Sequence, residues 1–250
     1  MAGNTRNPGQ SVSARLLAVL AAFEGDRAAL TLTDIAAATG LAPATAHRLV
    51  GELVDWGALV RTEKGQYVVG QRLWKLGMRA PVQADLREIA SPFLHDIYGA
   101  TLATVHLAVR DGDQVLYLDR LAGHASVPAV SRIGARLPLH TTGVGKVLLA
   151  YAPEEVQDRV LVSLTRATPY TVTQPGTLRG ELRRVRRDGF ARTVEEMTLG
   201  ACSVAVPVQR VDGDVIAALG IVVPDLGRDR AKLVAALQVA AQGIRRSFPD

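Results

Sequence analysis

Two helical segments joined by Gly40-Leu41-Ala42 constrain the fold of this chain more than any other feature of its sequence. Glycine adopts the left-handed backbone that a tight turn between two helices needs. We expect Thr33 to cap the first segment, Asp34–Thr39, and Pro43 to lie in the first turn of the second, which reaches Trp56. The pattern predicts a helix-turn-helix.

The segments around this pair extend the motif. Ser11–Gly25 is amphipathic at helical spacing and predicts a preceding helix. Two short extended runs, Ala58–Thr62 and Gln66–Val69, follow the pair and are joined by Glu63-Lys64-Gly65, which predicts a β-hairpin. A short helix is expected over Gln71–Arg79. Helix, helix-turn-helix and hairpin in this order predict a winged helix-turn-helix.

Composition and charge limit the classes of function. The chain has 250 residues, 48% of them hydrophobic and 4% aromatic, with a net charge of +5. Such a chain forms real cores, lacks the aromatic platforms of single-strand binders, and holds no apolar run long enough to cross a membrane. Residues 1–80 carry nine Lys+Arg against six Asp+Glu, so the excess positive charge is denser there. The sequence start has no apolar core typical of a signal peptide, and the single Cys202 allows no internal disulfide, so we expect a cytoplasmic location.

The second helix of a helix-turn-helix enters the major groove with its first residues. Arg48 has the fork that matches guanine, and Thr45 lies three residues before it on the same face. In the hairpin, Arg61 and Lys64 are candidate phosphate or minor-groove contacts, against the alternative of a solvated hairpin tip. The candidate DNA-binding residues are Thr33, Pro43, Ala44, Thr45, His47, Arg48, Arg61 and Lys64.

The remainder of the chain predicts an α+β domain. Two strand pairs surround turns that contain Asp-Gly, and helical segments flank them, which favours an antiparallel sheet covered by helices. The predicted strands are Thr101–Val109, Gln114–Leu121, Ser203–Val211 and Val215–Val223. The predicted helices are Val82–Tyr98, Val144–Tyr151, Pro153–Leu164, Thr177–Asp188 and Arg228–Ser247.

The sequence gives little support for groups of residues typical of an enzyme active site. Glu195 and Glu196 are adjacent and would point to opposite faces of a strand, so they form no carboxylate pair there. Cys202 with His140 or His106 is a conceivable nucleophile and base, but a lone cysteine among small residues is more often part of a core. The five histidines lack metal-ligand spacing, and no Walker-type loop is present. We therefore expect no enzyme activity, no metal and no cofactor.

Three blocks of sequence resemble the IclR family of bacterial transcription regulators. The first lies in the predicted DNA-binding domain, in the stretches 32–36, 40–49 and 65–70. The second and most specific runs from Arg136 to Ala150 and includes Gly143-Val144-Gly145-Lys146. The third includes Gly189-Phe190-Ala191 and the stretch 200–208. The resemblance covers about residues 11–247.

The resemblance implies a C-terminal GAF/PAS-like effector-binding domain. In the sequence itself, the glycines before a helix offer free N–H groups to an anion, with Thr141, Thr142 and Lys146 nearby, although close packing alone also explains small residues there. The positions that the family's pattern assigns to the pocket are less polar here, which favours an aromatic or branched acid. The candidate effector-binding residues are Leu137, Gly143, Val144, Thr193, Ser203, Gly220 and Val222.

The sequence thus predicts a two-domain α+β regulator of transcription. Its expected parts are a flexible arm at 1–10, a winged helix at 11–70, a helical linker at 71–81, and an effector-binding and oligomerisation domain at 82–250. We expect a repressor that binds a pseudo-palindromic operator in double-stranded DNA as a homodimer or dimer of dimers, tuned by a small organic acid. The alternative is a regulator whose C-terminal domain only dimerises or binds proteins. A membrane is not an expected partner.

Overall fold

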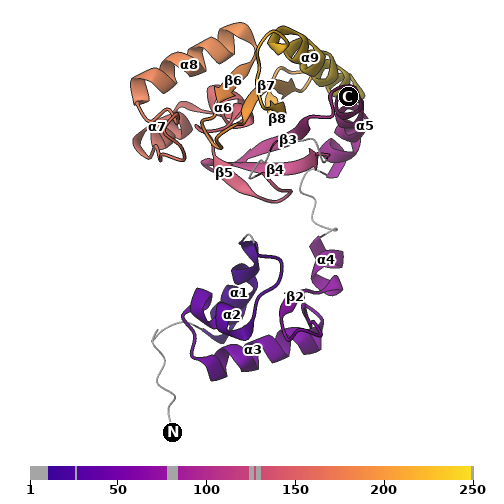
Figure 1. Ribbon diagram of the computed structural model, residues 1–250, viewed down its shortest axis with the longest axis vertical. Helices are drawn as coiled ribbons and strands as arrows, with labels where there is room; N and C mark the ends of the chain where they lie inside the picture. The colour runs from indigo at the N-terminus through magenta and orange to yellow at the C-terminus, as the bar shows by residue number, and fades with distance from the viewer. Residues whose placement is uncertain (1–10, 26, 78–83, 124–126, 128–130, 249–250) are drawn as a thin grey trace. The chain divides into compact units, whose positions relative to one another are not determined.

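The computed structural model describes residues 11–25, 27–77, 84–123, 127 and 131–248, and the chain divides into two compact units, Met1–Val82 and Gln83–Asp250 (Figure 1). The expected arm at 1–10 and the end of the expected linker, 78–81, lie outside the described residues. Each unit has its own hydrophobic core.

The N-terminal unit is a winged helix-turn-helix. Its elements are α1 (Val12–Ala21), the 3₁₀ turn η1 (Ala22–Glu24), α2 (Leu32–Thr39), α3 (Pro43–Trp56), β1 (Leu59–Arg61), β2 (Tyr67–Val69) and α4 (Gln71–Gly77). Val19, Ile35 and Leu49 are fully buried between the first three helices. Gly40 ends α2 with a φ of 67°, the left-handed conformation that the turn requires.

The cap of α2 differs from the sequence-based expectation. The capping residue is Thr31, whose hydroxyl accepts from the N–H of Asp34 at 3.1 Å while the Asp34 carboxylate accepts from the N–H of Thr31 at 2.9 Å. This capping box needs an acid three residues after the cap, and Thr33 has Ala36 there. The expectation that Thr33 caps the helix was wrong. Thr33 instead lies exposed within the first turn of α2.

The wing is tied to the helices by its backbone. Tyr67 of β2 exchanges two backbone hydrogen bonds with Leu30, which precedes α2, at 3.0 and 2.7 Å. A Cβ at Gly70 would lie 2.4 Å from the carbonyl oxygen of Gly57, so only glycine lets the chain leave the hairpin this close to the end of α3. The hairpin is therefore held in a fixed position against the recognition helix.

The C-terminal unit is built on one six-stranded antiparallel sheet with the order β5-β4-β3-β8-β7-β6. Its strands are β3 (Thr104–Asp111), β4 (Gln114–Leu121), β5 (Arg136–Pro138), β6 (Ala191–Val194), β7 (Cys202–Gln209) and β8 (Val215–Val223). Its helices are α5 (Ala84–Thr101), α6 (Gly143–Ala150), α7 (Glu154–Val162), α8 (Pro175–Asp188) and α9 (Arg230–Ser247).

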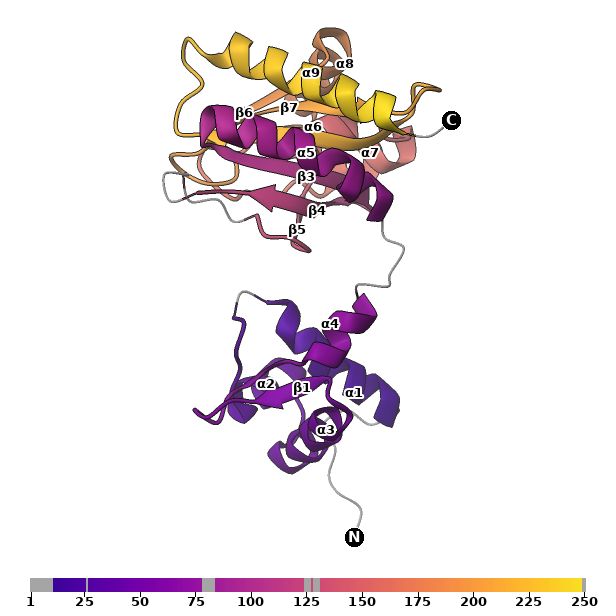
Figure 2. The ribbon, with the colours of Figure 1, turned by 90° about the vertical axis from the view of Figure 1, so that its right-hand side faces the viewer.

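Helices cover both faces of this sheet. Helices α5 and α9 lie side by side over one face, as Figure 2 shows, and enclose the core around Leu107, Leu219 and Leu237. Helices α6, α7 and α8 cover the other face. Short side chains such as Ala205 and Ala218 let α6 approach the sheet there. This is the α+β, two-domain class that the sequence predicted.

Some element boundaries moved. The predicted strand from Thr101 begins only at Thr104, because α5 continues to Thr101 and Leu102 turns the chain with a φ of 53°. The three-residue strand β5 was not predicted, since it has no alternation long enough to detect. None of the described helices is long and apolar enough to span a membrane.

Candidate functional sites

The N-terminal face of α3 is the candidate nucleic-acid interface. Ala46, Leu49 and Val50 are buried against α1 and α2, so the helical period leaves the residues between them exposed. Pro43, Ala44, His47 and Arg48 are exposed and Thr45 is half-buried. The structure therefore brings the predicted recognition residues together at one end of one helix.

Arg48 is paired in the free protein. Its Nη1 contacts the Glu52 carboxylate one turn later, and the two side chains are 56% and 50% exposed. An exposed pair at this spacing stabilises a helix by only about 0.3–0.5 kcal/mol. A guanine edge, worth roughly 1–3 kcal/mol of discrimination, outweighs this pair. This weak, exposed pair is therefore compatible with Arg48 as a candidate base contact.

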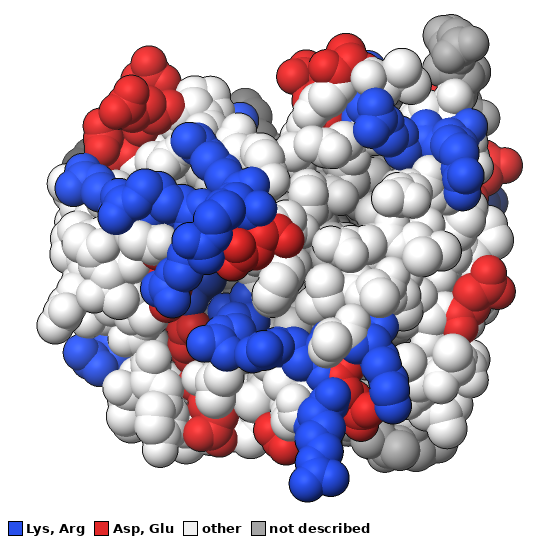
Figure 3. All heavy atoms as spheres, turned by 90° about the horizontal axis from the view of Figure 1, so that it is seen from above, with Lys and Arg blue, Asp and Glu red and all other residues white. Residues whose placement is uncertain are grey.

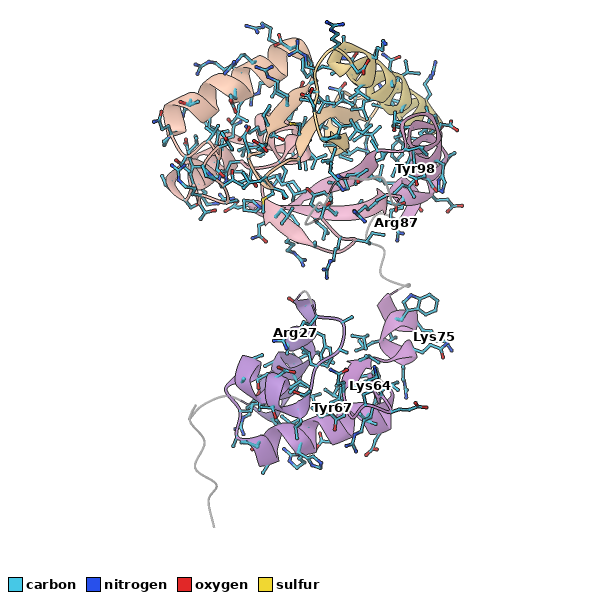
Figure 4. The ribbon with its side chains drawn as sticks, viewed as in Figure 1. Arg27, Lys64, Tyr67, Lys75, Arg87 and Tyr98 are labelled. Atoms are coloured by element: carbon cyan, nitrogen blue, oxygen red, sulfur yellow. The ribbon has the colours of Figure 1, made fainter. Side chains whose placement is uncertain are left out.

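The wing carries the other predicted cations. Arg61 ends β1 and Lys64 lies in the turn, and both are exposed, whereas Tyr67 on the same hairpin is buried (Figure 4). Positive charge is not confined to this unit. Figure 3 shows Lys and Arg side chains gathered over α8, which carries Arg179, Arg183, Arg184, Arg186 and Arg187. Charge alone therefore does not distinguish the candidate DNA interface, and its assignment to α3 and the wing rests on the helix-turn-helix geometry.

A pocket lies in the C-terminal unit between the start of α6 and the sheet. It has a volume of about 50 Å³. All seven residues that the sequence analysis proposed for an effector site line it: Leu137, Gly143, Val144, Thr193, Ser203, Gly220 and Val222. The other lining residues are His106, Tyr117, Ser131, Thr141, Thr142, Met197, Thr198, Ala201, Val204 and Ile221.

The N-terminus of α6 forms one polar end of the pocket. Thr142 caps this helix, its hydroxyl accepting from the N–H of Gly145 at 3.0 Å. The N–H groups of Gly143 and Val144 stand in the first turn, where no carbonyl of the helix can reach them. The Thr193 and Ser203 hydroxyls, 2.6 Å apart on β6 and β7, lie beside them. This end is suited to an anionic group, which the helix dipole also favours.

Two glycines allow α6 to lie close to the sheet. A Cβ at Gly143 would lie 2.6 Å from the Ser203 hydroxyl, and a Cβ at Gly220 would lie 2.7 Å from a methyl of Val144. Both separations are shorter than real Cβ contacts. The glycines let α6 rest directly on β7 and β8, so its free N–H groups sit at the pocket.

A second group of polar side chains lies along β3 and β4. His106 is 3% exposed, and its Nε2 is 2.6 Å from the Ser131 hydroxyl. Burial, with a smaller effect from the Arg120 charge, lowers the pKa of His106 to about 3, so the ring is neutral at physiological pH. The Tyr117 ring packs edge-on against it with centroids 5.0 Å apart. Burial raises the pKa of Tyr117 to about 12, although a hydrogen bond with the Thr142 side chain acts in the opposite direction.

Lys146 does not belong to the pocket that its position in the sequence indicated. Its side chain is 1% exposed, and Nζ is 2.6 Å from the Glu196 carboxylate and 2.7 Å from that of Glu181. Burial raises the pKa of Glu196, and the Lys146 charge opposes this shift. The Lys146 ammonium joins α6 to α8 and to the loop after β6, instead of binding an effector.

The catalytic alternatives do not form. Cys202 packs in the core under α5 and α9, whereas His106 lies on the opposite face of the sheet. His140 bonds the Thr165 carbonyl at 2.8 Å. Glu195 and Glu196 lie in a loop after β6, and the Glu196 carboxylate accepts a hydrogen bond from the Lys146 ammonium. Within the residues that the structure describes, no group of His, Cys, Asp and Glu is arranged to hold a metal ion.

Sequence reasoning missed the pocket residues His106, Tyr117, Ser131 and Met197. A signal for His106 was present, because Thr104 and His106 alternate with the apolar Val105 and Leu107 in the buried part of β3. Ser131 and Met197 lie in loops, where no periodicity marks which side chain turns inward.

Comparison with known proteins agrees with this geometry. The family model for the bacterial transcriptional regulator IclR C-terminal domain matches residues 78–246, and that for the IclR helix-turn-helix domain matches residues 13–63. HTH-type transcriptional regulator XynR of Escherichia coli is 35% identical over 215 residues, which are 85% of each chain. The p-hydroxybenzoate hydroxylase transcriptional activator of Acinetobacter baylyi is 33% identical over 82% of this chain and 78% of its own.

A solved structure is also similar. An IclR homologue from Microbacterium hydrocarbonoxydans, crystallised with 4-hydroxybenzoate, is 38% identical and superposes with a TM-score of 0.88 over 94% of this chain and 98% of its own. These relatives are regulators of transcription and not enzymes. With a winged helix, a pocketed α+β domain and both family models matched, the chain belongs to the IclR family of bacterial transcriptional regulators.

Proposed function

We propose that this regulator binds a pseudo-palindromic operator as a homo-oligomer and represses transcription, with its DNA affinity tuned by a small aromatic carboxylic acid. The observation that carries the proposal is the pocket: free N–H groups of α6 lie at one polar end, and the lining includes the apolar side chains of Leu137, Val144 and Met197. A carboxylate fits the helix N-terminus, and a ring fits the apolar walls.

The structurally similar homologue binds 4-hydroxybenzoate, which supports an aromatic acid as the effector here. The pocket of about 50 Å³ is smaller than the roughly 150 Å³ cavity that holds benzene in an engineered protein. A ring-sized ligand therefore requires small outward movements of lining side chains. Met197 is suited to such movement, because its unbranched side chain adapts to irregular space.

The DNA contacts in this proposal are those predicted from the sequence. Ala44, Thr45, His47 and Arg48 face the major groove from α3, and Pro43 sets the first turn of that helix. Thr33 at the start of α2, with Arg61 and Lys64 on the wing, meets the phosphate backbone.

Self-association is supported by apolar side chains that a monomer leaves in water. Val12 and Leu17 on α1 are 54% and 62% exposed, and Trp74 and Leu76 on α4 are 60% and 51% exposed. Large exposed apolar residues on two helices of one small unit are typical of an interface. A second copy on this surface would present two recognition helices to half-sites about 34 Å apart, or a multiple of that spacing.

The effector would act by population shift. A ligand changes DNA affinity only by binding one arrangement of the oligomer better than another, and the coupling is reciprocal. Operator DNA should therefore change the affinity for the acid by the same factor by which the acid changes the affinity for DNA.

The test is fluorescence anisotropy with duplexes tiled across the region upstream of the chain's own gene, at ~150 mM salt with random duplex as competitor. Saturable binding that survives the competitor, and that 4-hydroxybenzoate shifts, supports the proposal. Thr193→Val should remove the shift and leave ligand-free DNA binding intact. Run-off transcription from the bound promoter then tests repression, which predicts less transcript when protein is added.

The alternative, a C-terminal unit that only dimerises, predicts a pocket without a ligand. A melting temperature that is unchanged by a series of aromatic and branched acids would favour it, because a ligand of the folded state raises stability by RT ln(1+[L]/Kd).

A further inference from the structure

A second hollow lies in the C-terminal unit, at the outer edge of β6. It has a volume of about 530 Å³, within the range of small-molecule sites, and its lining comes mainly from α8, β6 and the segments next to β6. Strand β6 ends the sheet, so its outer edge has no strand partner. None of the seven residues proposed for the effector pocket lines this hollow, so the two are separate sites.

The most buried charges of the hollow are already paired with one another. The Lys146 ammonium, which is 1% exposed, lies 2.7 Å from the Glu181 carboxylate and 2.6 Å from that of Glu196. Within the described part of the chain, neither carboxylate makes an ion pair with an arginine of the hollow. These two acids therefore leave the arginines of the lining without a counter-charge.

Asp188 is the third acid of the lining, and its partner lies outside the hollow. The Asp188 carboxylate accepts from Arg187 Nε at 2.7 Å, and Arg187 is not part of the lining. This hydrogen bond, more than the nearby Arg184 charge, lowers the pKa of Asp188, so the group is ionised at neutral pH. An anion in the hollow would meet one repelling charge at this residue.

Three arginines line the hollow from three different elements. Arg184 lies on α8, Arg192 on β6 and Arg230 at the start of α9. All three side chains are exposed, and among the residues that the structure describes none of them makes an ion pair. A guanidinium presents a planar fork of donors that matches the oxygen atoms of phosphate and carboxylate groups. The hollow thus gathers three unpaired anion-binding groups.

The start of α9 adds positive potential on the same side. Arg230 is the first residue of this helix, and Asp229 before it makes no side-chain hydrogen bond that would cap the helix. The N–H groups of a first helical turn have no carbonyl within the helix to bond, and the helix dipole places partial positive charge there. Both effects favour an anion beside Arg230.

We propose that the hollow beside β6 is a second ligand site, which binds a small organic anion with two or more negative charges through Arg184, Arg192 and Arg230. A multiply charged anion is required because Asp188 repels the ligand, and several guanidinium contacts must outweigh that repulsion. Tyr170 and Phe190 also line the hollow and offer aromatic surface to a carbon skeleton.

The test is isothermal titration of the full chain with citrate and with pyrophosphate, at ~150 mM salt to screen weak attraction to the surface. Citrate offers carboxylates and pyrophosphate offers phosphates, so the tighter of the two identifies the group that the site takes. Acetate is the singly charged control. We expect saturable binding of citrate or pyrophosphate that is at least about tenfold tighter than that of acetate.

Four variants assign this binding to the hollow. Arg184→Gln and Arg192→Gln change exposed side chains, so each should fold, and each should weaken the binding of the multiply charged anion about tenfold. Asp188→Asn removes the repelling charge and should tighten the binding. Arg183→Gln is the matched control, because Arg183 is exposed on the same helix but does not line the hollow, and it should leave the affinity unchanged.

Three results would overturn the site. Neither anion may bind saturably, or Arg183→Gln may weaken binding as much as Arg184→Gln, which would mean general attraction to the basic face of α8. A larger loss for Lys64→Ala on the wing would place the anion on the winged helix. The titration contains no DNA and no aromatic acid, so its failure leaves the proposed function standing.

Discussion

At the scale of single residues, the behaviour of the candidate site residues depends on the neighbours that the fold gives them. Arg48 is paired with Glu52, and His106 is kept neutral by burial. Neither property is visible in the residue type. Both follow from the helix turn or the strand that places the side chain beside its neighbours.

Arg48→Ala should reduce discrimination between operator and random DNA by roughly 1–3 kcal/mol, because a guanidinium fork on a guanine edge is sequence-specific. Anisotropy titrations on both DNAs measure the difference. The matched control is Lys64→Ala on the wing, which should weaken both DNAs equally and reduce the salt slope by about one unit. Equal losses on both DNAs for Arg48→Ala would contradict base recognition by this residue.

His106 should make folding sensitive to acid. Its pKa is about 3 in the folded chain and about 6.5 when unfolded, so its stabilising effect is complete above pH 6.5 and is lost as the pH falls toward 3. Between pH 7 and pH 5, the wild type should lose roughly 2 kcal/mol more unfolding free energy than His106→Gln, which cannot titrate. Urea denaturation at both pH values measures this, and parallel losses in the two proteins would refute the assignment.

At the scale of elements, α6 connects the pocket to the loop after β6 in the C-terminal unit. Its first turn forms the polar end of the pocket, and its buried Lys146 holds the loop after β6 through Glu196. The same loop contributes Met197 and Thr198 to the pocket and is closed by a hydrogen bond from the Glu195 N–H to the Ala201 carbonyl, at 3.0 Å. The ion pair therefore holds the pocket wall in place.

Lys146→Met should destabilise the chain by about 3–5 kcal/mol, because it leaves the Glu196 carboxylate buried without a counter-charge. The double variant Lys146→Met with Glu196→Gln should be less destabilised than Lys146→Met alone, since the unpaired charge is gone. Denaturant unfolding of the wild type, Lys146→Met, Glu196→Gln and the double variant completes the double-mutant cycle. Additive effects of the two substitutions would mean that the ion pair does not couple these elements.

At the scale of the whole molecule, the proposed function requires more than one copy. A winged helix reads one half-site, and a pseudo-palindrome needs two recognition helices related by two-fold symmetry. The exposed apolar side chains on α1 and α4 are the surface that we assign to this pairing.

Trp74→Glu should convert the oligomer to a smaller species and reduce operator affinity, because a carboxylate at an apolar interface loses its hydration. Light scattering after size-exclusion chromatography measures the mass. Val162→Glu is the control, since Val162 is 87% exposed on α7 of the other unit and should leave the mass unchanged. An unchanged mass for Trp74→Glu would move the interface away from α4.

The sequence by itself determined the local elements and their order. The recognition helix begins at Pro43 and ends at Trp56, as predicted, because helix starts and stops depend on backbone preferences within a few residues. Family resemblance placed seven residues that line the pocket, including Thr193 and Ser203 from different strands.

Tertiary structure decided which side chains meet. The cap of α2 by Thr31 is not one of these contacts, because its capping box with Asp34 spans only three residues. Lys146 is paired with Glu196 outside the pocket, and His106 lies opposite Arg120 through the register of β3 with β4. Register and burial join residues far apart in the chain, so the local pattern that predicts a strand leaves its partners, and hence its chemistry, undetermined.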